Sequence, residues 1–121
     1  GHDDYCMILD NGILKVRAEG ETAAAVQKAS LNDGTWHHVA AVFPGGPATL
    51  KNVAFYIDGA AVSSKLEGVD AEIDTDVFRG LRVGARYNNA ADPYRGMLDD
   101  MRLWVSALNE AEIRSIYQEI R

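Results

Sequence analysis

The chain has 121 residues with 12 Lys or Arg and 18 Asp or Glu, which gives a formal net charge of −6 at pH 7. This length predicts a single domain that spans residues 1–121. The acidic balance and the absence of a Lys/Arg cluster argue against nucleic-acid binding. No apolar run approaches the ~20 residues that a membrane-spanning helix needs, so we expect no membrane insertion.

Short strand patterns separated by turn signals occupy most of the chain. Asn11-Gly12 and Asp58-Gly59 each stand between two apolar runs, and both dipeptides are strong hairpin signals. The segment 36–43 is rich in Val and aromatic side chains and predicts a well-buried strand. In chain order, the predicted strands cover residues 6–9, 13–18, 22–30, 36–43, 53–57, 61–66, 73–78, 81–84 and 97–104.

The pattern changes to a helical period from Asn109 onward. Asn109 is a good N-cap residue, and Glu112 three positions later completes a capping-box pattern. Apolar side chains then recur at i, i+3, i+4 and i+7, namely Ile113, Ile116, Tyr117 and Ile120. Many short strands followed by one such helix predict an all-β fold, an antiparallel β-sandwich or jelly roll with one short C-terminal helix.

Five segments resemble, in the right order, motifs of laminin-G-like, concanavalin A-like jelly-roll domains. They are NDGTWHHVA at 32–40, FYIDG at 55–59, LRVG at 81–84, YRGMLDDMRLW at 94–104 and SALNEAEI at 106–113. The resemblance extends from about residue 10 to residue 117. Pentraxins share the pattern of the last strand and helix more loosely. The resemblance implies a concanavalin A-like sandwich.

The resemblance also implies strands that precede this segment. Domains of this kind normally carry several strands before the one that matches residues 13–18, and little precedes Cys6 here. We therefore expect a domain truncated at its N-terminus, as part of a longer protein or completed by another chain. The strand at 97–104, from Met97 to Trp104, would otherwise keep an open edge. We expect a partner chain, in a homo-oligomer or a complex, or a rearranged local segment to cover it.

The stretch AEIDTD at residues 71–76 raises an enzymatic alternative. In a strand, Glu72 and Asp74 share one face at a separation of roughly 7 Å, a spacing compatible with glycoside hydrolysis. Glucanases of the same superfold carry a strand of pattern E-x-D-x-x-E, but Val77 stands where its last Glu is needed. The stretch lies in a variable region of laminin-G-like domains, which favours an exposed acidic strand over a catalytic one.

Asp99 is the candidate calcium ligand. As a strand, residues 97–104 place Asp99 on the same face as Met97, Met101 and Leu103, which we expect to face the core. Laminin-G-like relatives often bind calcium near the sandwich rim, which implies a site formed by Asp99, Asn88 and Asp92. The alternative is that Asp99 accepts hydrogen bonds from nearby backbone amides or from Arg.

The polar loop at 87–94 is the candidate ligand site. Its tyrosines would stack on sugar rings and its amides would bond hydroxyl groups. The predicted carbohydrate-binding residues are therefore Tyr87, Asn88, Asn89 and Tyr94. The tandem histidines His37 and His38 point to opposite faces of a strand and are poorly placed to chelate one metal. One of these imidazoles is expected to bond backbone or a turn.

These observations lead to three hypotheses about function. The leading one is a non-catalytic recognition module that binds carbohydrate or protein, within a larger secreted or cell-envelope protein. This hypothesis places the domain outside the cell, in the periplasm or at the cell surface. The alternatives are a glycoside hydrolase that uses Glu72 and Asp74, and a purely structural or assembly domain.

Overall fold

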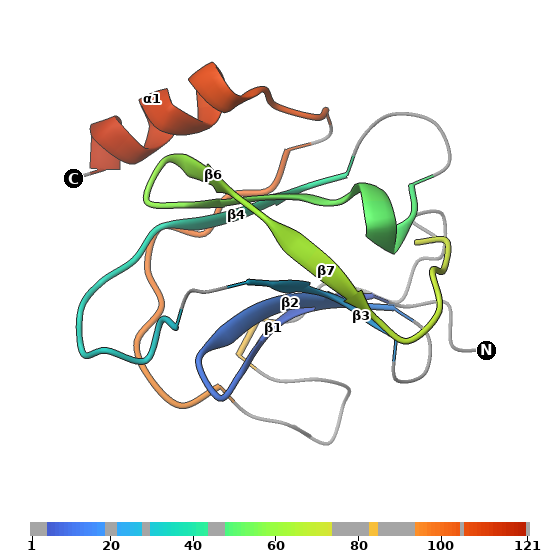
Figure 1. The fold of residues 1–121 in the computed structure, drawn as a ribbon. Helices are drawn as coiled ribbons and strands as arrows, with labels where there is room; N and C mark the ends of the chain where they lie inside the picture. The colour runs from blue at the N-terminus through green and yellow to red at the C-terminus, as the bar shows by residue number, and fades with distance from the viewer. Residues whose placement is uncertain are drawn as a thin grey trace.

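The computed structural model describes residues 5–18, 22–27, 30–43, 48–73, 83–84, 94–104 and 106–120. Within these ranges the chain forms two antiparallel sheets that lie face to face, with an α-helix above one of them (Figure 1). The arrangement is that of a β-sandwich jelly roll with one C-terminal helix, which confirms the predicted fold class.

The two sheets divide the strands unequally. A four-stranded sheet has the order β1-β2-β3-β7, from β1 (Cys6–Asp10), β2 (Ile13–Arg17), β3 (Ala23–Val26) and β7 (Ser64–Glu67). A three-stranded sheet has the order β4-β5-β6, from β4 (Val39–Val42), β5 (Ala54–Ile57) and β6 (Ala60–Val62). The chain crosses between the sheets where β6 continues into β7 (Figure 1). The predicted strand at 61–66 is therefore two strands in different sheets. A short 3-10 helix, η1 (Leu50–Asn52), precedes β5.

Both predicted hairpins form with two-residue turns. Asn11 and Gly12 have φ values of 50° and 83°, and Asp58 and Gly59 have φ values of 52° and 80°. Positive φ at both central positions is the type I′ turn, whose twist matches that of the flanking strands. A Cβ atom on Gly59 would also lie 2.8 Å from the Tyr117 ring, so the second hairpin needs glycine for space as well.

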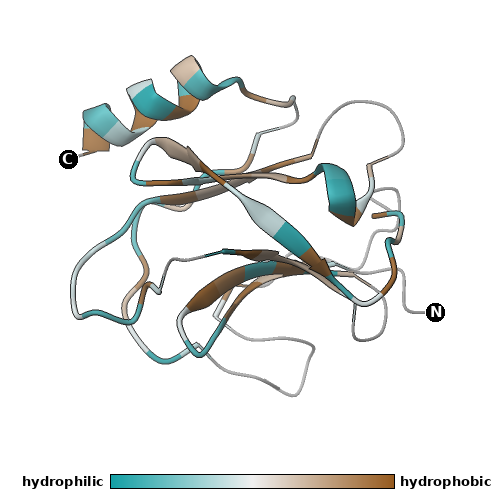
Figure 2. Cartoon of the chain, in the orientation of Figure 1, coloured by the Kyte–Doolittle hydropathy of each residue, from teal (hydrophilic) through white to brown (hydrophobic). Residues whose placement is uncertain are grey.

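The core lies between the facing sides of the two sheets. Its largest fully buried side chains come from both sheets and from η1, and they are Leu14, Val16, Leu50 and Phe55. Alternate residues of β2 reach this core because successive strand residues point to opposite faces. Figure 2 shows the strands as mostly brown, with teal segments along the helix and the connecting turns.

Ala23 and Ala25 of β3 lie on the outer face of the four-stranded sheet, whereas Ala24 belongs to the core. Ala25 lies directly opposite Lys15 of β2. The Lys15 ammonium donates to Asp10 at 2.9 Å and reaches across β3 to Glu67 of β7 at 2.7 Å. Small side chains on β3 leave room for this reach. The low strand propensity of alanine is therefore offset by contacts with neighbouring strands, since the preference of a residue for a strand depends on its surroundings.

The helix α1 (Glu110–Ile120) begins at the predicted capping box. The Glu112 amide donates to Asn109 Oδ1 at 2.8 Å, and the Asn109 amide donates to Glu112 Oε1 at 2.9 Å. Ile113 is buried, and the helix covers the three-stranded sheet (Figure 1). Among the described residues, no helix combines the length and the apolar character required to cross a bilayer.

The predicted strand at 36–43 is shorter than expected. Only Val39–Val42 pair with β5, and Val39 lies opposite Ile57, the last residue of that strand. Residues 36–38 extend past the end of β5 and lie outside this ladder. Trp36 is 62% exposed, so its predicted burial is wrong.

The strand predicted at 97–104 is absent from the described structure, although its residues are described. Asp100 adopts a positive φ of 53°, which lies outside the extended region that a strand residue occupies. The Asp100 carboxylate accepts a 2.9 Å bond from Arg102 within the same segment. The expectation that Met97, Asp99, Met101 and Leu103 face the core is therefore wrong, because these four side chains are exposed. What covers this segment in an assembly stays a prediction.

The contrast between the buried core and the exposed segment 97–104 can be tested by truncating one side chain in each. Phe55 is 1% exposed and Leu103 is 78% exposed. We expect Phe55→Ala to lower the free energy of unfolding by about 3–5 kcal/mol because it leaves a cavity. Leu103→Ala should change it by no more than about 0.5 kcal/mol. Urea denaturation measures both, and a Leu103→Ala loss as large as that of Phe55→Ala would mean that segment 97–104 is buried in solution.

Candidate functional site

The candidate site is centred on the turn at residues 32–36, called here the Trp36 turn. Its first half is closed by Asp33, whose Oδ1 accepts bonds from the Thr35 amide at 3.1 Å and the Thr35 hydroxyl at 2.8 Å. Such a side-chain bond to the backbone two residues on is an Asx turn. It fixes the backbone immediately before Trp36.

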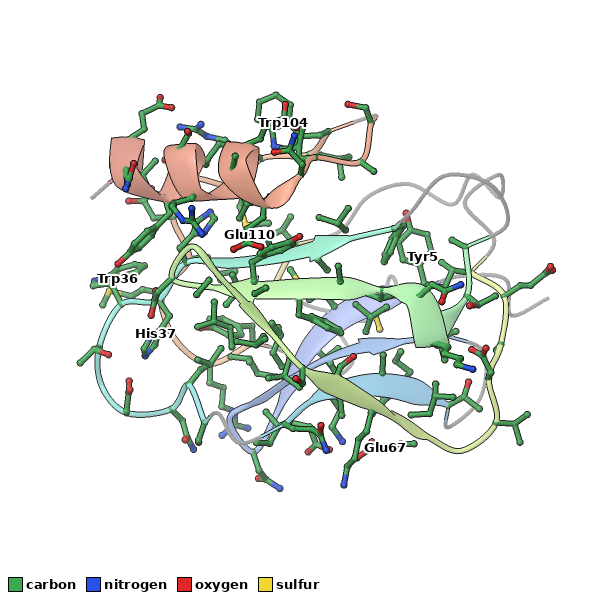
Figure 3. The ribbon with its side chains drawn as sticks, turned by 45° about the horizontal axis from the view of Figure 1, so that its top comes forward. Tyr5, Trp36, His37, Glu67, Trp104 and Glu110 are labelled. Carbon is green, nitrogen blue, oxygen red and sulfur yellow. The ribbon has the colours of Figure 1, made fainter. Side chains whose placement is uncertain are left out.

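His37 joins the Trp36 turn to the β5–β6 hairpin. Its Nδ1 lies 2.8 Å from Asp58 Oδ2, and its Nε2 lies 2.9 Å from both carboxylate oxygens of Asp33. The Asp58 carboxylate also accepts the His38 amide at 2.9 Å, and the Asp58 amide donates to the His38 carbonyl at 2.8 Å. The prediction that one imidazole bonds a turn is confirmed for His37. Figure 3 shows Trp36 and His37 side by side at one end of the sandwich.

The partners of His37 select its protonated form. Ionised carboxylates only accept hydrogen bonds, and only the imidazolium carries a proton on both ring nitrogens. The hydrogen bond to Asp58, followed by that to Asp33, accordingly raises the pKa of His37 above its ordinary 6.5. The Thr35 hydroxyl, followed by His37, lowers the pKa of Asp33 from 3.8 to about 2.

These shifts fix the pH range in which the contacts stabilise the fold. The His37 contribution is fully present below pH 6.5 and is lost as the pH rises through the raised pKa of the folded state. The Asp33 contribution is present above pH 3.8 and is lost as the pH falls toward about 2. The bridge is therefore strongest in mildly acidic solution.

His38 has the opposite environment. Its ring lies against Tyr117 of α1, with ring centroids 6.0 Å apart, and its buried Nδ1 has no hydrogen-bond partner among the described residues. Burial lowers the pKa of His38, against a smaller opposing effect of the Asp58 and Asp100 charges. Because the fold favours the neutral ring, His38 destabilises the fold as the pH falls below 6.5. The two adjacent histidines thus act in opposite directions.

The arrangement includes the elements of a catalytic relay but does not favour catalysis. Asp58 contacts His37 Nδ1, and the Thr35 hydroxyl lies 3.0 Å from His37 Nε2, in the order of a nucleophile–His–Asp triad. Asp33 occupies the same Nε2 position and stabilises the protonated ring. A protonated imidazole does not accept the hydroxyl proton, so this geometry suits holding the turn rather than activating Thr35.

Trp36 is the functional candidate that the sequence patterns missed. Its exposed ring is surrounded in sequence by Asn32, Asp33 and Thr35, which are exposed polar residues. A large apolar plane with hydrogen-bonding groups beside it suits recognition of an amphipathic ligand. The feature of the sequence that could have revealed this site is the turn-forming stretch Asp33-Gly34-Thr35. A closed turn at 33–35 delays the start of the strand, so Trp36 lies outside it.

The predicted carbohydrate loop is described only at one end. Tyr94 is exposed, and its amide donates to the Gly84 carbonyl at 2.6 Å. Tyr87, Asn88 and Asn89 lie outside the described residues. The carbohydrate role of this loop therefore stays a prediction.

The predicted acidic sites are likewise only partly described. Asp99 is exposed and accepts a 2.8 Å bond from the Asp100 amide, which matches the hydrogen-bonding alternative. Asn88 and Asp92 lie outside the described residues, so the calcium site stays a prediction. Glu72 is exposed and forms an isolated bridge with Thr49, and Asp74 also lies outside the described residues. In the part of the chain that the structure describes, no group of three or more His, Cys, Asp or Glu is placed to hold a metal ion.

Titration of the two imidazoles tests this electrostatic picture. By NMR, we expect His37 to titrate above pH 6.5 and His38 below it, because their environments favour opposite protonation states. Asp58→Asn should lower the His37 midpoint by removing the charge beside Nδ1, and Asp70→Asn, in another loop, should leave it unchanged. A His37 midpoint at or below 6.5 in the unmodified chain would contradict the two-carboxylate bridge.

Comparison with known proteins places this chain in a family. The Laminin_G_3 family, described as Concanavalin A-like lectin/glucanases superfamily, matches residues 8–114. A 2.1 Å crystal structure of an S-layer domain-containing protein (residues 221–444) from Clostridium thermocellum ATCC 27405 is similar, with a TM-score of 0.51 and 17% identity. That match covers 94% of this chain and 63% of the other, so this chain spans less than two thirds of its neighbour, and the likeness shows a shared fold. No curated protein matches this chain. The chain belongs to the laminin-G-like family of the concanavalin A-like lectin/glucanase superfamily.

Proposed function

We propose that this domain is a non-catalytic recognition module of a cell-envelope protein, and that it binds carbohydrate through the Trp36 turn. The observation that carries the proposal is an exposed tryptophan on a turn that hydrogen bonds fix at both ends. The superfamily name includes both lectins and glucanases, so the fold alone does not decide between binding and catalysis.

The Trp36 turn has the properties that sugar recognition needs. An indole plane stacks on the apolar C–H face of a pyranose, and neighbouring oxygen and amide groups bond the hydroxyls. Asn32 and Asp33, close to Trp36 in sequence, are exposed and carry such groups. Because the turn is already fixed, binding requires little further loss of conformational entropy.

The charge of the domain narrows the ligand class. Asp33 and Asp58 lie in the site, and the whole chain carries a net charge of −6. Like charges across an interface are unfavourable. We therefore favour neutral or amino sugars over sulfated or phosphorylated ones.

The location of the domain is part of the proposal. The similar structure comes from an S-layer domain-containing protein, which supports a role at the cell surface or outside the cell. We retain calcium as a proposed cofactor through Asp99, Asn88 and Asp92, and the ligand experiment is designed to include it.

A second candidate function has its own observation. Segment 97–104 exposes Met97, Met101, Leu103 and Trp104, and exposed apolar side chains in one segment often mark protein interfaces. An assembly role, with a partner chain or a second copy covering this segment, is therefore the alternative. The glycoside-hydrolase alternative through Glu72 and Asp74 gains no comparable support, because only Glu72 is described.

A glycan array with matched tryptophan variants separates these functions. We expect the unmodified chain and Trp104→Ala to bind the same neutral or amino sugars, and Trp36→Ala to lose at least tenfold in affinity, ~1.4 kcal/mol. Trp104, at 52% exposure, is a fair control for Trp36. Each protein is screened with calcium and with chelator, which tests the metal proposal at the same time.

Two results would contradict the carbohydrate proposal. One is that no glycan binds in either calcium condition. The other is that Trp36→Ala binds as well as the unmodified chain. The assembly role would instead be favoured if the molecular mass of the protein in solution rises with its concentration and Trp104→Ala abolishes this rise.

A further inference from the structure

We infer that His37 is a proton-operated clamp, whose doubly protonated ring holds the Trp36 turn against the β5–β6 hairpin and whose loss of one proton releases that turn. The evidence for this clamp is the geometry of the hydrogen bonds around His37. Its effect on ligand binding rests on the proposed function.

The two nitrogens of the His37 ring differ in solvent exposure, and this difference decides which of them loses its proton. The contact between Nδ1 and Asp58 is partly buried, whereas the contact between Nε2 and Asp33 is exposed. Water replaces a lost partner more easily at the exposed side. The neutral ring therefore keeps its proton on Nδ1 and faces Asp33 with an unprotonated Nε2.

Loss of the Nε2 proton removes the contact between the His37 ring and Asp33. An Nε2 lone pair and the Asp33 carboxylate are both acceptors, so their 2.9 Å contact becomes repulsive. The Thr35 hydroxyl donates to Asp33 in the clamped state and already lies 3.0 Å from Nε2. Its single proton stays with the Asp33 carboxylate, because a charged acceptor forms the stronger hydrogen bond. Asp33 therefore keeps both Thr35 donors and loses only its contact with the His37 ring.

The Asp58 side of the clamp is unaffected by this change. Asp58 still accepts the Nδ1 proton and the His38 amide, and its own amide still bonds the His38 carbonyl. Release is therefore confined to residues 33–36, with Trp36 as the last residue of the freed segment. The hairpin and the packing of α1 remain in place.

Two carboxylates face His37 among the described residues. Asp33 faces it from the Trp36 turn, and Asp58 faces it from the hairpin. Asp100 and Arg102 act on the neighbouring His38 ring instead. Because both carboxylates raise the pKa of His37, the release occurs above pH 6.5. The domain would therefore present a fixed Trp36 in mildly acidic surroundings and a mobile one in alkaline surroundings.

The test follows Trp36 and His37 in one NMR titration of the whole chain from pH 5.5 to 9. Carbon-13 order parameters of the Trp36 ring report its mobility without interference from amide exchange. We expect the Trp36 order parameter to fall with the same midpoint as the His37 titration. The His38 ring, which is packed against Tyr117 and whose pKa is lowered by burial, should stay rigid and serves as an internal control.

Asp33→Asn is the decisive variant. Asn also forms Asx turns, so the turn is kept, and its amide offers a donor as well as an acceptor to Nε2. Deprotonation of His37 then removes no bond, and the Trp36 order parameter should no longer change with pH. Asp70→Asn, which alters a carboxylate bonded to the Lys51 amide in another loop, should behave as the unmodified chain.

Either of two outcomes overturns the clamp. The first is a Trp36 ring whose mobility does not change while His37 loses its proton. The second is an Asp33→Asn chain with the same pH dependence as the unmodified one. No glycan is used, so failure of the clamp is distinct from failure of the carbohydrate proposal.

Discussion

The carboxylate of Asp58 connects the regular sheet to the irregular turn that carries Trp36. One oxygen accepts the His38 amide and the other contacts the His37 ring. Its position is set by the type I′ hairpin, which requires a positive φ at Asp58 and at Gly59. Tyr117 of α1 packs against Gly59, so the helix also supports the hairpin. A candidate recognition surface is thereby fixed by a hairpin and a helix, although it lies on a turn.

The elements that depend on local chemistry were predictable from the sequence. Asn11-Gly12 and Asp58-Gly59 specify their turns by conformational preference, and Asn109 with Glu112 specifies the start of α1 by two reciprocal hydrogen bonds. The elements that depend on distant partners were not predictable. Residues 36–38 have a strand-like pattern but extend past the end of β5. Segment 97–104 has alternating apolar residues but forms no strand, and Asp100 within it has a positive φ.

The candidate site shows the same contrast. The sequence indicated that His37 and His38 would point in different directions and that one would bond a turn. It did not indicate which carboxylates lie near His37, because Asp58 is brought there by the pairing of β4 with β5. Two adjacent imidazoles therefore have opposite pKa shifts, one caused by carboxylates and the other by burial. Trp36 was missed as a surface residue because its exposure results from where β4 begins.

We infer that both ring nitrogens of His37 carry a proton when the Trp36 turn is in place. Neutron diffraction from crystals grown at mildly acidic pH, below the ordinary histidine pKa of about 6.5, observes these hydrogen atoms directly. We expect one hydrogen on Nδ1 directed at Asp58 and one on Nε2 directed at Asp33, with the Trp36 turn closed. A closed turn around a ring that carries only one of these hydrogens would contradict this inference.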